Sequence, residues 1–226
     1  MIGERFAPLF PPDFVVVDAP PEPGLERLWP EERGAVEGAV VARQAEYATA
    51  RWLCREAMRR LGVEARAVPS SSERMPCWPQ GLVGSIAHTR GLCVAVLGRA
   101  SRWAAVGIDV EPDEPVNETL HARLCRADEQ PSVTLWGEEP AARGRAVRLL
   151  FCIKEAFYKC QYPCTRTFLG FQDARVAVHL DGRFELELLR DAGPWRAGRR
   201  LAGRWSRQEG YLAAGIALAR SEEGSP

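Results

Sequence analysis

The sequence lacks several features that would at once identify a membrane, secreted or nucleic-acid-binding protein. No apolar run approaches the length of a membrane-spanning helix, and prolines interrupt the start of the chain where a signal peptide would need its apolar stretch. We therefore expect a cytoplasmic protein without membrane association. Lys plus Arg and Asp plus Glu both total 30, so net charge gives no case for nucleic-acid binding. Any anion site must be built locally from particular basic side chains.

Two kinds of ligand motif are also missing. Neither glycine-rich phosphate loop, GxxxxGK[ST] or GxGxxG, occurs, so a nucleotide would have to be bound by side chains. The seven cysteines are odd in number and lack paired CxxC spacing, and no second pair or histidine near Cys160 and Cys164 completes a zinc site. We expect most of the cysteines to be reduced and buried.

The elements that the pattern predicts fall into two similar halves. Apolar stripes predict two helices, over 43–61 with a stop at Gly62 and over 146–161 with an end at Pro163. An extended lead-in is expected over 7–24 and a polar connection over 112–145. Runs between turn signals predict strands over 83–87, 92–97, 104–110, 175–180, 184–189, 201–206 and 211–218.

The order of a long helix followed by strands thus occurs twice, although we find no convincing repeat at the level of residues. This order predicts an α+β protein of two similar subdomains with pseudo-twofold symmetry, each a long helix packed on a mainly antiparallel sheet. We expect the N-terminal subdomain to span 1–111 and the C-terminal subdomain 112–226, with a site in the crevice between them.

Two acids alternate in the segment Gly107-Ile-Asp-Val-Glu111. Residues two apart on a strand share a face, so Asp109 and Glu111 would lie together. Neighbouring carboxylates repel each other, and a bound cation relieves the repulsion; oxygen-only ligands favour Mg²⁺. A solvated strand end with two exposed acids is the alternative, and these residues alone leave it open.

A second cluster lies on the polar side of the second predicted helix. Glu155 and Lys159 stand four apart, with Lys154 beside them. Taken alone, they predict a surface ion pair that contributes about a few tenths of a kcal/mol. Set against the two acids of the strand, a third carboxylate with two ammonium groups suits a phosphate-bearing substrate and a metal.

Basic residues of the first half form a third group. Arg43 and Arg51 lie eight apart on the first predicted helix, within about 80° of each other around its axis. His88 ends the strand Gly84-Ser-Ile-Ala-His88. Arginine forks and a histidine suit phosphate recognition, and the alternatives are a solvated helix face and a capped strand end.

Taken together, the residues of these segments and their order resemble those of the 4′-phosphopantetheinyl transferases of the larger, monomeric class, which activate siderophore, nonribosomal peptide and polyketide synthases. GIDVEP followed by FxxKEAxYK is the specific part of the resemblance. It covers roughly residues 43–190, in the segments Arg43-x7-Arg51-x3-Arg55, Pro76-Cys-Trp-Pro79, Gly84-Ser-Ile-Ala-His88, Gly107-Ile-Asp-Val-Glu-Pro112, Leu150-Phe-Cys-Ile-Lys-Glu-Ala-Phe-Tyr-Lys159 and Phe168-Leu-Gly-Phe171.

The resemblance implies an enzyme that moves the 4′-phosphopantetheine group of coenzyme A to a serine of an acyl or peptidyl carrier protein and releases 3′,5′-ADP. It implies that Glu155 is the base for the serine proton, and that Lys159, with Lys154 nearby, steadies the leaving nucleotide. The implied ligands of Mg²⁺ (or Mn²⁺) are Asp109, Glu111 and Glu155. The implied ligands of the nucleotide phosphates are Arg43, Arg51, Arg74 and His88.

One departure from the family pattern and two other functions need mention. Ala87 stands where the family usually has Ser or Thr, which removes a hydroxyl contact worth about 1 kcal/mol of cofactor affinity. The carboxylates also fit a metal-dependent phosphodiesterase that uses water as its acceptor, and the fold could serve as an inactive carrier-binding module. Three apolar residues of the polar connection, which either dock the carrier or pack internally, are Leu120, Leu124 and Trp136.

Overall fold

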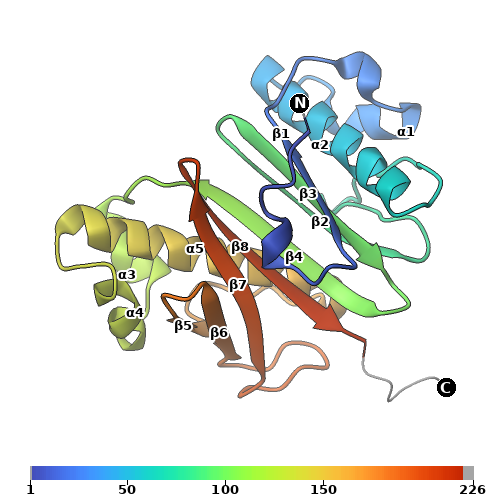
Figure 1. Ribbon diagram of the computed structural model, residues 1–226. Coiled ribbons are helices and arrows are strands. Elements are labelled where there is room, and N and C mark those ends of the chain that lie inside the picture. The colour runs from blue at the N-terminus through green and yellow to red at the C-terminus, as the bar shows by residue number, and fades with distance from the viewer. Residues whose placement is uncertain (1, 221–226) are drawn as a thin grey trace. The chain divides into compact units, whose positions relative to one another are not determined.

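The computed structural model of the protein describes residues 2–220, which form helices and two β-sheets (Figure 1). The strands are β1 (Val15–Ala19), β2 (Leu82–Thr89), β3 (Leu92–Arg99), β4 (Trp103–Pro112), β5 (Ala174–Val178), β6 (Arg183–Leu188), β7 (Arg200–Gln208) and β8 (Tyr211–Ala219). The helices are α1 (Pro30–Arg33), α2 (Val41–Arg60), α3 (His121–Leu124), α4 (Gln130–Thr134) and α5 (Pro140–Thr165), with 3-10 turns η1 (Ala7–Leu9), η2 (Leu25–Arg27), η3 (Gly34–Val36), η4 (Glu118–Leu120) and η5 (Ala127–Glu129).

The chain divides into two compact units. Unit 1 contains the described residues as far as Val106 together with those from Ala217 on, and unit 2 is Gly107–Ile216. One sheet has the strand order β1-β3-β2 and the other β4-β8-β7-β6-β5. The predicted α+β class, with a long helix and a mainly antiparallel sheet in each half, is therefore confirmed.

In unit 1, α2 packs on β1 and β3. Its end at Gly62 is the predicted one, because this glycine takes the left-handed conformation (φ +69°) and Val63 N–H returns to Met58 O. The apolar stripe of α2 is the reason that the helix lies on the sheet. The core between them contains Val17, Ala19, Leu53, Cys54, Ala57, Met58, Val68, Cys93, Ala95 and Leu97.

In unit 2, α5 differs from the predicted helix at both ends. It begins six residues earlier, with Pro140 in its first turn. The N–H groups of that turn have no acceptor within the helix, so a proline there costs no hydrogen bond. It also continues past Pro163 to Thr165, so the prediction that this proline ends the helix was wrong. Pro163 lies in the last turn, where only one intrahelical hydrogen bond is forfeited, and the helix stops where Arg166 turns left-handed (φ 53°).

The connection over 112–145 is also more ordered than its polar composition indicated. It contains η4, α3, η5, α4 and the start of α5. Trp136 anchors its far end by packing on Trp205 of β7, with ring centroids 5.4 Å apart. All seven cysteines are free and five of them are buried, as predicted. Among residues 2–220, no helix has both the length and the apolarity that a bilayer span requires.

Candidate active site

The site in unit 2 depends on a close approach of β4 to α5. Gly107 of β4 lies against the helix backbone, and a Cβ at this position would stand only 1.9 Å from Ala156 O. Only glycine permits this approach. It brings the following residues of the strand beside the turn of α5 that carries the predicted catalytic residues, and so joins two of the three clusters that the sequence indicated.

Asp109 is the buried member of the acidic pair. Its side chain is 9% exposed and accepts a hydrogen bond from Lys159 Nζ at Oδ1 over 2.7 Å. Lys159 Nζ also donates to Ile108 O over 3.2 Å. The second carboxylate oxygen, Asp109 Oδ2, is buried and has no hydrogen-bond partner. A buried anionic oxygen without a partner is costly, so this atom is suited to an additional cationic ligand.

Glu111 lies two residues further along β4 and is held by an arginine of α5. Arg148 Nη1 donates to Glu111 Oε2 over 3.0 Å. Burial, reinforced by the charge of Asp109, raises the pKa of Glu111 to about 7, although Arg148 and Lys159 lower it. The two acids therefore interact, as their alternation on the strand predicted.

Glu155 faces the same cluster from α5. Burial raises the pKa of its carboxyl, the charge of Asp109 raises it further, and Lys159 acts in the opposite direction. The three carboxyl groups and Lys159 are thus within electrostatic reach of one another. A carboxylate with a raised pKa is a better proton acceptor than an ordinary surface glutamate.

The donor set fits a divalent cation only in part. Between residues 2 and 220, no three His, Cys, Asp or Glu side chains converge closely enough to hold a metal as they stand. Two observations nevertheless favour a cation here: Asp109 and Glu111 offer only oxygen atoms, and Asp109 Oδ2 lacks a partner. Oxygen ligands with open positions for water and phosphate are what Mg²⁺ takes in proteins. Asp109 and Glu111 therefore fit part of a Mg²⁺ site, and Glu155, on whose pKa the charge of Asp109 acts, is a candidate for a further oxygen ligand.

Lys154 does not face this cluster. It is 3% exposed, and its Nζ donates to Glu129 Oε2, Phe171 O and Leu124 O over 2.8, 2.8 and 3.1 Å. Burial lowers the pKa of Lys154, although the charge of Glu129 raises it. An ammonium group has three N–H donors, so all of them are engaged by the protein. Lys154 and Lys159, which the sequence analysis placed in one cluster, therefore lie in different surroundings.

A second group of predicted residues lies in unit 1, where α2 begins beside β2. Arg43 Nη1 donates to His88 Nε2, which leaves the ring proton on Nδ1, 3.3 Å from Glu46 Oε2. The side chains of Arg43 and His88 are 45% and 38% exposed. A basic pair with this exposure can bind an anionic group from solution, while Glu46 partly offsets its charge.

Arg51 is not on this exposed surface. It is 5% exposed, its Nε donates to Val68 O over 2.7 Å, and its Nη2 donates to Ser70 Oγ over 3.0 Å. Its guanidinium also covers the ring of Tyr47 at 3.9 Å. Arg74 lies in the same segment after α2 and is exposed, with a left-handed backbone (φ 63°). Arg51 thus supports the segment that carries Arg74, whereas Arg43 contacts β2.

The residues that sequence reasoning proposed for carrier docking take different positions. Leu124 is 7% exposed and Trp136 packs on Trp205, so both have internal packing, whereas Leu120 is 42% exposed. Sequence reasoning missed Arg148 altogether. The signal that could have found it is its spacing: it stands seven residues before Glu155, two helical turns away on the same face of α5.

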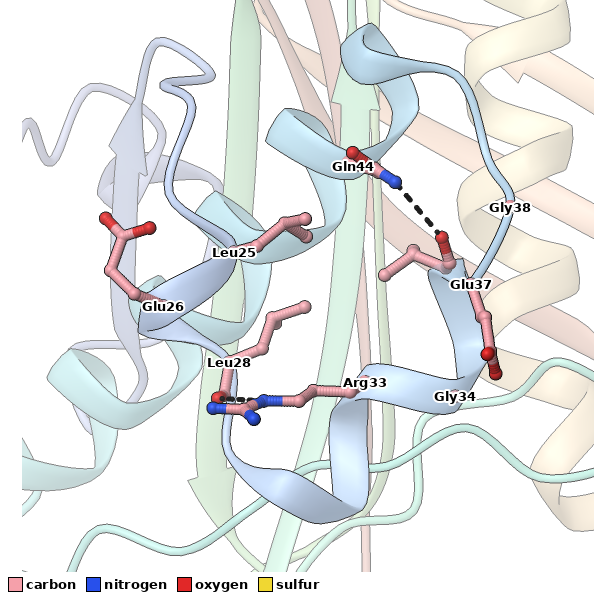
Figure 2. Close-up of a pocket in the computed structure, with 9 residues that line it drawn as sticks. Leu25, Glu26, Leu28, Arg33, Gly34, Glu37, Gly38 and Gln44 are labelled. Carbon is pink, nitrogen blue, oxygen red and sulfur yellow. Dashed lines mark hydrogen bonds between the residues drawn. The ribbon is translucent and has the colours of Figure 1, made fainter.

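A hollow of about 620 Å³ in unit 1 is separate from these groups (Figure 2). It lies between the segment 25–38 and Gln44 of α2, and the residues that line it include none of those predicted for the site. Two hydrogen bonds fix its wall, from Gln44 Nε2 to Val36 O and from Arg33 Nε to Leu28 O. Chemistry, not the size of a cavity, therefore locates the candidate site.

Comparison with known proteins gives two profile matches that together cover most of the chain. The profile of the 4′-phosphopantetheinyl transferase N-terminal domain matches residues 31–98, and that of the 4′-phosphopantetheinyl transferase superfamily matches residues 105–214. The 4′-phosphopantetheinyl transferase Svp of Streptomyces mobaraensis is 39% identical over 209 residues, which cover 89% of this chain and 82% of Svp. PptT of Mycobacterium tuberculosis is 36% identical over 211 residues, 87% of this chain and 88% of PptT.

A more distant relative is enterobactin synthase component D of Salmonella typhi, 28% identical over 185 residues, 79% of this chain and 73% of that protein. Svp and PptT are identical to this chain at more than a third of the aligned positions, and the alignments cover most of its length. The two profile matches include the Arg43–His88 group and the Asp109–Lys159 cluster respectively. The chain accordingly belongs to the 4′-phosphopantetheinyl transferase superfamily of enzymes, which use coenzyme A to modify carrier-protein domains.

Proposed function

We propose that this enzyme transfers 4′-phosphopantetheine from coenzyme A to a serine hydroxyl of an acyl or peptidyl carrier protein, with Mg²⁺, and releases 3′,5′-ADP. The observation that carries the proposal is the cluster of Asp109, Glu111, Glu155 and Lys159, built by the contact of Gly107 with α5. The name of the enterobactin relative supports carriers of siderophore synthases as targets, while carriers of peptide and polyketide synthases are a prediction from the sequence resemblance. We also retain the prediction that the enzyme acts as a monomer.

In this proposal the three carboxylates of the cluster hold the cation. When bound, Mg²⁺ would offset the negative charge of the coenzyme A pyrophosphate. The orphan oxygen of Asp109 and the oxygen-only donor set support the assignment. Mn²⁺ takes the same ligands and could replace Mg²⁺.

Glu155 acts as the base. The serine oxygen forms a bond to the phosphorus that carries pantetheine, the bond from this phosphorus to the bridging oxygen breaks, and 3′,5′-ADP leaves with the electron pair. The serine proton passes to the Glu155 carboxylate, whose raised pKa suits this role. Lys159, which contacts Asp109 in the structure, would steady the charge of the leaving group.

The nucleotide end would be bound by basic side chains of unit 1. Arg43 and His88 are both partly exposed, and in this proposal His88 binds the 3′-phosphate while the exposed Arg74 contributes a further positive charge. Arg51 supports the segment that carries Arg74 through Val68 and Ser70, and its role as a phosphate ligand stays a prediction.

The test is intact-mass spectrometry of an apo carrier protein incubated with the enzyme, coenzyme A and Mg²⁺. The expected result is a gain of one phosphopantetheine group, about 340 Da, that EDTA and Glu155→Gln each abolish. Hydrolysis of coenzyme A without transfer would instead support a phosphodiesterase. No gain on any acyl or peptidyl carrier, with no calorimetric binding of coenzyme A, would leave only the inactive carrier-binding module.

A further inference from the structure

The long helices of the two units contain similar six-residue segments that begin and end with a basic residue and share Glu-Ala at the second and third positions, a likeness that inspection of the sequence did not reveal. Arg55-Glu-Ala-Met-Arg-Arg60 of α2 corresponds to Lys154-Glu-Ala-Phe-Tyr-Lys159 of α5. The burial of the two segments also corresponds. The first, third and fourth positions are buried in both, and the glutamate at the second position is half-buried in both. The first basic residue of each segment is 3% exposed.

Each of these two buried basic residues contacts a buried glutamate, and the hydrogen-bond patterns of the two glutamates are similar. In unit 1, Glu32 accepts from Arg55 Nη1 at both oxygens, from Val68 N at Oε1 and from Trp29 N at Oε2. Arg55 also donates to Arg27 O. The glutamate therefore joins the segment before α2, the helix itself and the segment that follows the helix.

Unit 2 repeats most of this arrangement, although Lys154 donates to only one oxygen of its glutamate and also donates to Phe171 O. Glu129 accepts from Lys154 Nζ and Arg126 N at Oε2, and from Val176 N at Oε1. Lys154 also donates to Leu124 O, two residues before Arg126, just as Arg27 stands two residues before Trp29. We call these two arrangements the staples: Glu32–Arg55 with its backbone partners, and Glu129–Lys154 with its backbone partners.

Unit 1 serves as an internal control for the meaning of the staple. There the equivalents of Glu155 and Lys159 are Glu56 and Arg60, which form an ordinary ion pair of 3.0 Å on the surface of α2. The staple is complete in unit 1 beside this surface pair, so it does not depend on the chemistry of a site. Its common consequence in both units is to fix one turn of the long helix against the segments before and after it.

We propose that Lys154 is a positioning residue: through Glu129 it fixes the turn of α5 that carries Glu155, and it does not bind the phosphates of coenzyme A. The residue after Lys154 is the proposed base, so a loosened staple changes the position of Glu155. The turnover readout rests on the proposed transfer reaction. The stability and coenzyme A readouts do not, because they need no carrier protein.

The experiment compares Lys154→Met, Glu129→Gln and the double variant with Arg55→Met as the matched control in unit 1. Lys154→Met leaves a buried carboxylate without its counter-charge, so its thermal midpoint falls by roughly 6 °C or more. In the double variant the uncompensated charge is gone, and roughly half of this loss returns. Arg55→Met removes the same staple from the unit without Glu155, so the midpoint falls comparably while kcat at saturating coenzyme A stays within about threefold.

Turnover and affinity separate the two roles of Lys154. If Lys154 is a positioning residue, Lys154→Met and Glu129→Gln both lower kcat by about tenfold or more. The calorimetric Kd for coenzyme A then stays within about threefold. If Lys154 is instead a phosphate ligand, Lys154→Met would weaken the binding of coenzyme A about tenfold with little change in the thermal midpoint. Glu129→Gln, which frees the ammonium group of Lys154, would then not lower kcat. This second pattern overturns the proposal. If Lys154→Met does not fold, Glu129→Gln with its native lysine decides by kcat and Kd.

Discussion

The contact of Gly107 with α5 can be tested by adding one methyl group. In Gly107→Ala the new Cβ would stand 1.9 Å from Ala156 O and 2.9 Å from Cys160 N. These are backbone atoms of a helix, so no side chain can rotate to make room, and strand and helix must separate by about 1 Å or more. Overpacking of a well-packed core costs about 1–3 kcal/mol, and obstruction by backbone places this change near the upper value, about 3 kcal/mol.

For a chain of this length, 1 kcal/mol corresponds to about 2–4 °C in Tm, so Gly107→Ala should lower the midpoint by roughly 6–12 °C. The same separation withdraws Asp109 from Lys159 and Glu155. A misplacement of about 1 Å can reduce turnover about a hundredfold, so kcat should fall with the midpoint. Circular dichroism during a thermal scan and the carrier-modification assay measure the two quantities.

Gly34→Ala is the matched control. A Cβ at Gly34 meets nothing within 4 Å, and its backbone is already helical (φ −61°, ψ −24°). This change should leave the midpoint unchanged or raise it by up to roughly 4 °C, because it restricts the unfolded chain. If Gly107→Ala matched Gly34→Ala in both midpoint and kcat, the close approach of β4 to α5, and the site built on it, would be refuted.

Two further outcomes follow from exposure. Arg43→Ala should raise KM for coenzyme A about tenfold or more, because a charge-assisted phosphate contact contributes about 1.5–3 kcal/mol. The thermal midpoint should change little, because the side chain is 45% exposed. An unchanged KM would remove Arg43 from the nucleotide site. Thiol labelling of the native protein at pH 8 should modify Cys77 first, because Cys77 is exposed, whereas burial raises the pKa of Cys54 and of Cys93 to about 12. Mass mapping that found either buried thiol labelled as fast as Cys77 would contradict this packing.

Local pattern was enough to predict several parts of the fold and the site. The two-residue repeat of a strand put Asp109 and Glu111 on one face, and the charge of Asp109 does act on Glu111. The 3.6-residue repeat and Gly62 fixed the face and the end of α2. Such features depend on residues close in the sequence, so the sequence contains the information that predicts them.

Pattern failed at two kinds of feature. Pro163 was expected to end a helix, yet α5 passes it, since a proline in the last turn forfeits little. The staples were not predicted because residues distant in the sequence form them. Glu32 and Glu129 stand in polar segments that resemble solvated loops, and their burial appears only when Val68 and Val176 return to them from beyond the long helices.

The clearest division concerns side chains of the same kind on the same helix. Sequence alone determined that Arg43 and Arg51 share a helix, and that Lys154 and Lys159 flank Glu155 on another. Only the tertiary structure decided that Arg51 and Lys154 are buried and engaged by backbone carbonyls, whereas Lys159 binds Asp109 and Arg43 meets His88. The physical reason is that an arginine or lysine takes its role from the acceptors around it. Those acceptors, except for Glu46 beside Arg43, lie more than fifteen residues away along the chain.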